Sequence, residues 1–241
     1  MKKLASFALA LLIAAAAFAQ APQTGAAARP ERPVPPEWPG FNRYKEANAA
    51  LTKAPKAVFF GDSITDGWAK KDPDFFSSNN FAGRGISGQT TAQMLVRLRA
   101  DVIDLGPRYM VLLAGINDLA MNNGPIELEN VFGNIVSMVE LVKLHKIKPV
   151  LCLLFPATRI GWRPSLGDPT EKIVRLNGMI ADYAKAHKIP CVEYFADIDK
   201  SSGNLPKELS HDSIHPNLDG YRIMEKEILK GYWTFWVMKS L

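Results

Sequence analysis

VFFGDSIT, at residues 58–65, joins a short apolar run to a polar turn. The run Val58-Phe59-Phe60 has the composition of a strand that is buried on both faces of a sheet. It ends at Gly61, and the polar residues beyond it suit the tight turn that leads from a strand into a helix. The stretch therefore predicts a strand-turn-helix unit, from which parallel α/β sheets are built.

Similar apolar runs recur along the chain, and stretches with helical spacing of apolar residues separate them. Further strands are expected at 109–114, 150–155 and 191–195, with a weaker candidate at 80–83. Helices are expected over 94–105, 128–142 and 173–184, and a last one is expected to begin near Pro216, since proline suits a first helical turn. This alternation predicts an α/β fold, a three-layer, doubly wound sandwich with a mostly parallel five-stranded sheet.

The first residues have the features of an export signal. Two lysines precede an apolar stretch at 4–18, and Ala17-Phe18-Ala19 fits a small-x-small cleavage site. A membrane span needs about 20 residues, so an uncleaved anchor is the lesser alternative. We predict a signal peptide over residues 1–19, cleaved after Ala19, and export to the periplasm or the extracellular space.

The remaining chain divides into a tail and one domain. Residues 20–40 are rich in alanine and proline, which predicts a partly extended N-terminal tail, and 41–241 has the length of one domain. No later segment is long and apolar enough to cross a bilayer. The aromatic run at 232–237 is expected to close the core, with a dimer contact or a membrane-surface contact as alternatives.

Charge and cysteine content narrow the set of partners. The formal net charge is +5, but the basic residues are scattered and form no nucleic-acid-binding motif, so no nucleic-acid partner is expected. Cys152 and Cys191 each lie in an apolar run, which predicts two inert buried thiols, although export would permit them to pair. No cofactor is expected.

Four polar clusters follow predicted strands or precede the last helix. They are GDSIT at 61–65, GISGQT at 85–90, GIND at 115–118 and DSIHPN at 212–217. In a doubly wound sheet, ligands bind at the carboxyl ends of the strands, so these clusters are expected to meet there. Taken singly, Ser63 could be a nucleophile or a helix cap, and Asn117 could donate to an oxyanion or form a turn.

The last cluster pairs a carboxylate with a histidine. Asp212 lies three residues before His215, close enough to hold the imidazole in one tautomer and to stabilise its protonated form. The alternative is a metal site, because His211 and His215 are four residues apart. Pro216 disfavours a helix through both histidines and no further cluster completes such a site, so no metal is expected.

Together and in this order, the four clusters resemble the hallmark blocks of the GDSL, or SGNH, hydrolase family, over roughly residues 57–230. The resemblance implies a flavodoxin-like SGNH-hydrolase fold and a serine esterase that works through an acyl-enzyme. Ser63 would be the nucleophile, His215 the general base and acid, and Asp212 the residue that orients His215. The N–H groups of Ser63 and Gly88 and the side chain of Asn117 would form the oxyanion hole. Many relatives have asparagine where this chain has Gly83.

The substrate is indicated by fewer residues. Trp68 follows the nucleophile loop, and the long loop after the fourth strand contains Arg159, Trp162 and Arg163. Aromatic and guanidinium side chains at these places could bind a sugar or another polar group of the substrate, and the alternative is that they pack the loop. The resemblance to secreted carbohydrate acetylesterases implies short-chain, chiefly acetyl, esters of small molecules or oligosaccharides. The alternatives are a lysophospholipase or thioesterase, an acyltransferase, and a non-catalytic carbohydrate-binding protein.

Overall fold

The structure of the protein is a computed structural model that describes residues 38–199 and 201–237. The predicted signal peptide over 1–19 and the predicted tail up to residue 37 lie outside the described residues. The side chains of the aromatic run at 232–237 also lie outside them, while its backbone belongs to the last helix. Within the described part of the chain, no helix has both the length and the apolar character that a membrane span requires.

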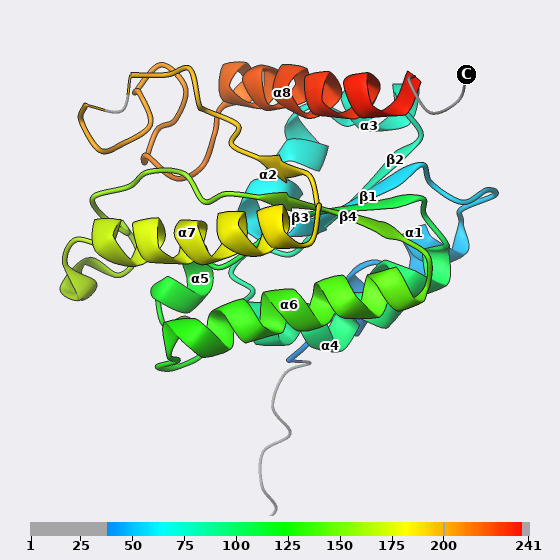
Figure 1. Cartoon of the computed structure of the whole chain (residues 1–241), viewed down its shortest axis with the longest axis horizontal. Helices are drawn as coiled ribbons and strands as arrows, with labels where there is room; N and C mark the ends of the chain where they lie inside the picture. The colour runs from blue at the N-terminus through cyan, green and yellow to red at the C-terminus, as the bar shows by residue number, and fades with distance from the viewer. Residues whose placement is uncertain (1–37, 200, 238–241) are drawn as a thin grey trace, which may run out of the picture. The chain divides into compact units, whose positions relative to one another are not determined.

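The strands form one five-stranded sheet in the order β2-β1-β3-β4-β5. Every neighbouring pair is parallel, which confirms the predicted doubly wound α/β fold (Figure 1). The strands are β1 (Ala57–Gly61), β2 (Phe81–Gly85), β3 (Tyr109–Leu113), β4 (Lys148–Cys152) and β5 (Cys191–Val192). The edge strand β5 is shorter than the predicted run to residue 195.

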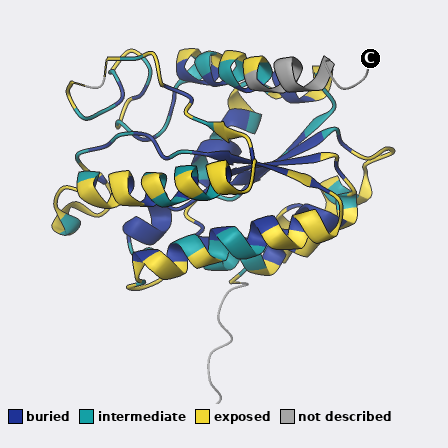
Figure 2. Cartoon of the chain, viewed as in Figure 1, coloured by how far each residue is buried: buried dark blue, intermediate teal, exposed yellow. Residues whose placement is uncertain are grey.

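Helices cover both faces of the sheet and make it the middle of three layers. One face carries α2 (Ser63–Lys71), α3 (Pro73–Ser78) and α8 (Leu218–Val237), and the other carries α4 (Thr91–Asp101), α6 (Leu128–Leu144) and α7 (Thr170–Ala186). The short elements are η1 (Phe41–Arg43), α1 (Lys45–Ala49), η2 (Ile103–Leu105), α5 (Ile116–Leu119) and η3 (Pro164–Leu166). Figure 2 shows the sheet buried between the helices, whose outer faces are exposed.

The two cysteines differ in burial. Cys152, on the interior strand β4, is buried, and desolvation raises the pKa of its thiol to about 12. Cys191 is exposed, so the prediction that it is a buried thiol is wrong. The physical reason is that β5 lies at the edge of the sheet, where only one neighbouring strand covers it. Both thiols are free.

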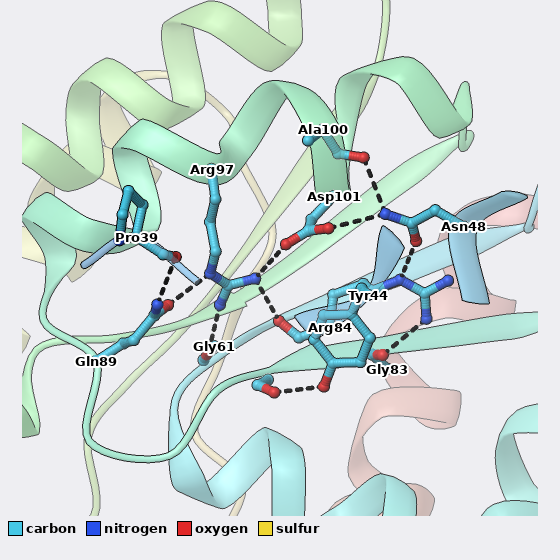
Figure 3. Close-up of polar contacts among 11 residues, drawn as sticks. Pro39, Tyr44, Asn48, Gly61, Gly83, Arg84, Gln89, Arg97, Ala100 and Asp101 are labelled. Carbon is cyan, nitrogen blue, oxygen red and sulfur yellow. Dashed lines mark hydrogen bonds and ion pairs between the residues drawn. The ribbon is translucent and has the colours of Figure 1, made fainter. Parts of the chain in front are cut away.

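A fully buried arginine on α4 connects the ends of the first two strands (Figure 3). Arg97 is 0% exposed and forms an ion pair with Asp101 at 2.9 Å. The same guanidinium donates to the backbone oxygens of Gly61 and Arg84 at 2.9 and 3.0 Å, and its Nε donates to Gln89 Oε1 at 2.5 Å. A charge buried this deeply is tolerated because Asp101 balances it and each of its three nitrogens has a hydrogen-bond acceptor. Arg97 therefore fixes the loops after β1 and β2 to helix α4.

The segment before β1 is held by the same network (Figure 3). Asn48 on α1 donates to Asp101 Oδ1 at 2.8 Å and accepts from Arg84 Nε at 2.6 Å. Gln89 donates to the backbone oxygen of Pro39 at 2.7 Å, and the Tyr44 hydroxyl donates to the backbone oxygen of Gly85. Residues 39–48 are thus connected to the carboxyl end of β2 through polar contacts.

Replacing Arg97 by methionine is expected to lower the free energy of unfolding by about 3–5 kcal/mol, because Asp101 would remain buried without its charged partner. Arg99→Met, two residues further along α4, is the matched control. Arg99 pairs with Asp104 at 3.6 Å and both side chains are more than half exposed, so its loss should change stability by about 1 kcal/mol or less. Urea denaturation at neutral pH measures both, and equal effects would contradict the prediction.

Candidate active site

The four clusters found in the sequence lie at the carboxyl ends of the strands, on the left in Figure 1. Ser63 begins α2 after β1, Gly88 follows β2, and Asn117 lies in α5 after β3. Asp212 and His215 lie in the long connection between β5 and α8. The parallel sheet explains this grouping, since every strand delivers its following loop to the same edge.

Three side chains form a continuous line of hydrogen bonds. Ser63 Oγ lies 2.8 Å from His215 Nε2, and His215 Nδ1 lies 2.6 Å from Asp212 Oδ2. The other carboxylate oxygen of Asp212 accepts the backbone N–H groups of Ile214 and His215, at 3.1 and 2.7 Å. The carboxylate is therefore held from two sides, and the imidazole is oriented to accept a proton from the serine hydroxyl.

The charge on Asp212 is supported by these contacts. Desolvation alone would raise its pKa, but hydrogen bonds from the His215 side chain and from two backbone N–H groups outweigh it and lower the pKa below its ordinary value. The carboxylate is therefore charged at neutral pH. A charged carboxylate at this place stabilises the imidazolium that would form when His215 accepts a proton.

Asp62 takes the capping role that Ser63 could have had. Its Oδ1 accepts the backbone N–H of Ile64 at 3.0 Å, as a helix N-cap does, and α2 begins at Ser63. The Ser63 hydroxyl is consequently left for His215. Asp62 is fully buried and its Oδ2 has no hydrogen-bond partner among the described residues, and this burial raises its pKa to about 6.

Potential oxyanion donors surround Ser63. In the described chain, the backbone N–H groups of Ser63 and Gly88 are not used in other hydrogen bonds. Gly88 has φ +80°, in the left-handed region where a side chain would be strained. Asn117 is 1% exposed, and its Nδ2 donates one hydrogen to the backbone oxygen of Gln89 at 3.0 Å. Such donors suit an oxygen that gains negative charge.

Trp162 lies beside the histidine. Its ring centroid is 5.7 Å from that of His215 at an angle of 42°, and 40% of the residue is exposed. Arg159 and Arg163, on the same loop, are exposed, and the structure forms no hydrogen bond between their guanidinium groups and the Ser63–His215–Asp212 line. Of the three loop residues predicted to bind substrate, Trp162 is the one placed against the histidine.

Trp68 lies in the core, which does not fit the prediction that it contacts substrate. It is 1% exposed and stacks between Phe75 and Tyr221, with ring centroids 5.4 and 5.7 Å away. Its indole N–H donates to Glu225 at 3.0 Å. The physical reason is that α2 turns this side chain inward, toward the aromatic residues of α3 and α8.

Two polar residues to which the sequence analysis gave no role of their own support this region. Buried Asp118 accepts the backbone N–H and the hydroxyl of Thr91, at 2.9 and 2.6 Å, which joins α5 to the start of α4. Burial raises the pKa of Asp118 to about 6. Asn122, just after α5, contacts both Gly88 and Asn117. The Asp of GIND was a visible signal, but nothing in the sequence around Asn122 distinguishes it from a turn residue.

Gly83 has a steric explanation in this structure. A Cβ atom built there would lie 2.6 Å from the Cβ of Ala69, because α2 packs directly on β2. The position therefore has no room for the asparagine that the family resemblance led us to expect there. In the described part of the chain, no group of three His, Cys, Asp or Glu side chains is arranged to hold a metal ion.

Comparison with known proteins places this site in a family. The sequence pattern of the GDSL-like lipase/acylhydrolase family matches residues 59–223, which include Ser63, Gly88, Asn117, Asp212 and His215. The chain belongs to this family. As a GDSL-like acylhydrolase, it is a carboxylic ester hydrolase.

Three similar proteins illustrate the relationship. A GDSL-like lipase from Bacteroides thetaiotaomicron is 42% identical, with a TM-score of 0.78 over 85% of this chain and 100% of that one. The isoamyl acetate-hydrolysing esterase of Saccharomyces cerevisiae is 23% identical over 209 residues, covering 75% of this chain and 87% of the esterase. An uncharacterised lipoprotein of Bacillus subtilis is 33% identical over 75 residues, and that match spans only 31% of its length.

The buried carboxyl of Asp62 predicts a dependence of stability on pH. A pKa raised from 3.8 to about 6 in the folded protein means that folding favours the protonated form. This stabilisation is fully present below pH 4 and is lost as the pH rises through 6. The shift of the pKa corresponds to a loss of about 3 kcal/mol in the free energy of unfolding. Asp62→Asn keeps the capping oxygen and cannot ionise, so its stability relative to the wild type should rise between pH 4 and pH 7.

Chemical denaturation at pH 4, 5, 6 and 7 measures this difference. Asp182→Asn, at an exposed position on α7, is the control and should follow the wild type throughout. If the wild type and Asp62→Asn gave parallel curves of unfolding free energy against pH, Asp62 would not titrate in this range.

Proposed function

We propose that this GDSL-like acylhydrolase is an exported serine esterase that hydrolyses short-chain esters, chiefly acetyl esters of carbohydrates, through an acyl-enzyme on Ser63. The observation that carries the proposal is the line of hydrogen bonds from Asp212 through His215 to Ser63, with lengths of 2.6 and 2.8 Å. This is the arrangement by which a weak hydroxyl nucleophile is activated.

The reaction follows from this geometry in two halves. Ser63 Oγ attacks the ester carbonyl while His215 Nε2 takes its proton, and the oxyanion is held by the N–H groups of Ser63 and Gly88 and by the Asn117 amide. The C–O bond to the alcohol breaks, and His215 gives the proton to the leaving alkoxide. Water then attacks the acyl group with His215 as the base again, which releases the acid and restores Ser63.

Trp162 and the yeast relative support the choice of substrate. An exposed indole beside the proposed base can pack against the face of a sugar, and the relative is named for hydrolysis of an acetate ester. The predicted signal peptide and the partial match to a Bacillus subtilis lipoprotein support export. Lipid and thioester substrates are the competing class, and the assay below separates them by chain length.

Hydrolysis of p-nitrophenyl esters from acetate to decanoate, beside acetylated xylo-oligosaccharides, tests the proposal. We expect acetyl esters to be preferred and Ser63→Ala to lower kcat by about 10⁶-fold, because the nucleophile is lost. Ser78→Ala, at an exposed serine on α3, is the matched control and should retain wild-type activity. Preference for long acyl chains would move the substrate to the lipid class, and full activity in Ser63→Ala would reject the mechanism.

Trp162→Ala tests the carbohydrate part separately. If a sugar packs on this indole, KM for acetylated xylo-oligosaccharides should rise about tenfold, the equivalent of about 1.4 kcal/mol of lost apolar contact. KM for p-nitrophenyl acetate, which carries no sugar, should change by less than about threefold. Equal changes for both substrates would show that Trp162 does not recognise the sugar.

A further inference from the structure

A side-chain amide can serve an oxyanion only through its NH₂ end, so the direction in which Asn117 points matters to the proposed reaction. Two neighbours define that direction. Asn117 Nδ2 donates to the backbone oxygen of Gln89 at 3.0 Å, and Asn117 Oδ1 accepts from Asn122 Nδ2 at 2.8 Å. The NH₂ group has two hydrogens. One is donated to Gln89, so the other is left for an oxyanion.

Asn122 is itself held in one direction. Its Oδ1 accepts the indole N–H of Trp162 at 3.0 Å, and an indole nitrogen can only donate. Its NH₂ end therefore faces the other way, toward Asn117 Oδ1 and toward the backbone oxygen of Gly88 at 3.1 Å. The backbone of Asn122 is fixed as well, since its N–H donates to the backbone oxygen of Asn117 at 3.0 Å.

Hydrogen bonds thus connect the three side chains, and each side chain donates to the next in the same direction, from Trp162 through Asn122 to Asn117. The donor-only indole of Trp162 sets the direction of the Asn122 amide, and the Asn122 amide sets that of Asn117. Reversing Asn117 would bring its NH₂ group against the NH₂ group of Asn122 and its oxygen against the Gln89 carbonyl. Each contact would then leave like groups facing each other, which is costly for a residue with 1% exposure.

We propose that Asn122 is a positioning residue for the oxyanion hole, and that Trp162 orients it through the indole N–H. This inference rests on the proposed function, because it requires Asn117 to be an oxyanion donor. Asn122 acts through Asn117, because its other side-chain donor contact is to the Gly88 carbonyl oxygen and not to the Gly88 N–H that would face the oxyanion. Within the described residues, it forms no hydrogen bond to the nucleophile or to the base. Its effect should accordingly appear in kcat rather than in KM.

Steady-state kinetics with p-nitrophenyl acetate on four variants of the full chain test this role. Asn117→Ala should lower kcat by about 10²–10³-fold. Asn122→Ala should lower kcat by about tenfold or more, with KM within about twofold of the wild type, since donor alignment matters in the transition state. In the double variant, kcat should stay within about threefold of Asn117→Ala alone, because both changes remove one interaction. Trp162→Phe, which keeps the ring and loses the N–H, should reproduce part of the Asn122→Ala loss.

Asn123→Ala is the matched control, since Asn123 is the exposed neighbour that accepts from Trp38 at 3.2 Å, and its kcat should equal that of the wild type. Wild-type kcat in Asn122→Ala, or losses that multiply in the double variant, would overturn the inference. If Asn122→Ala failed to fold by circular dichroism, unchanged kcat in Trp162→Phe would overturn the role given to the indole. Full activity in Ser63→Ala would instead reject the proposed function. If activity fell in Ser63→Ala and in Asn117→Ala but not in Asn122→Ala, only the role of Asn122 would be rejected.

Discussion

The guanidinium of Arg97 is the interaction on which the arrangement of the catalytic edge depends. A charge with no exposure must have its donors satisfied inside the protein, and the acceptors of Arg97 come from distant points in the sequence. One is the backbone carbonyl of Gly61, next to the nucleophile loop. Another is the side-chain oxygen of Gln89, a residue whose backbone oxygen accepts from Asn117. A single buried cation therefore sets the spacing of the loops that carry Ser63 and Asn117.

Much of the fold could be predicted from the sequence because buried parallel strands leave a strong local signal. The apolar runs at β1, β3 and β4 are continuous, and each ends at a glycine, a proline or a polar cluster. Strand β5 was predicted too long because an apolar run alone does not show where pairing with a neighbour stops. The same reasoning failed for Cys191, since burial at an edge depends on neighbours that the local sequence does not reveal.

The candidate site was predictable where its residues lie in compact motifs and not where contacts join distant loops. Ser63, Asp212 and His215 lie in two short clusters. The role proposed for Asn122 depends instead on its hydrogen bonds to residues 88, 117 and 162, which the sequence does not show. Trp68 was assigned to the substrate from its nearness to Ser63 in the sequence. Its spacing of four residues from Ile64 was the better signal, because both side chains lie on the buried face of α2.

The two edges of the sheet have a consequence for how the protein behaves at high concentration. Strand β5 has only two residues, so it offers few backbone groups to an approaching strand. At the other edge, Ile86 pairs inward with Gly61, so alternation turns the carbonyls of Gly83 and Gly85 outward, where Arg84 and Tyr44 already donate to them. Within the described residues, one edge is thus short and the outward carbonyls of the other are already hydrogen-bonded, which disfavours pairing with the sheet of another molecule.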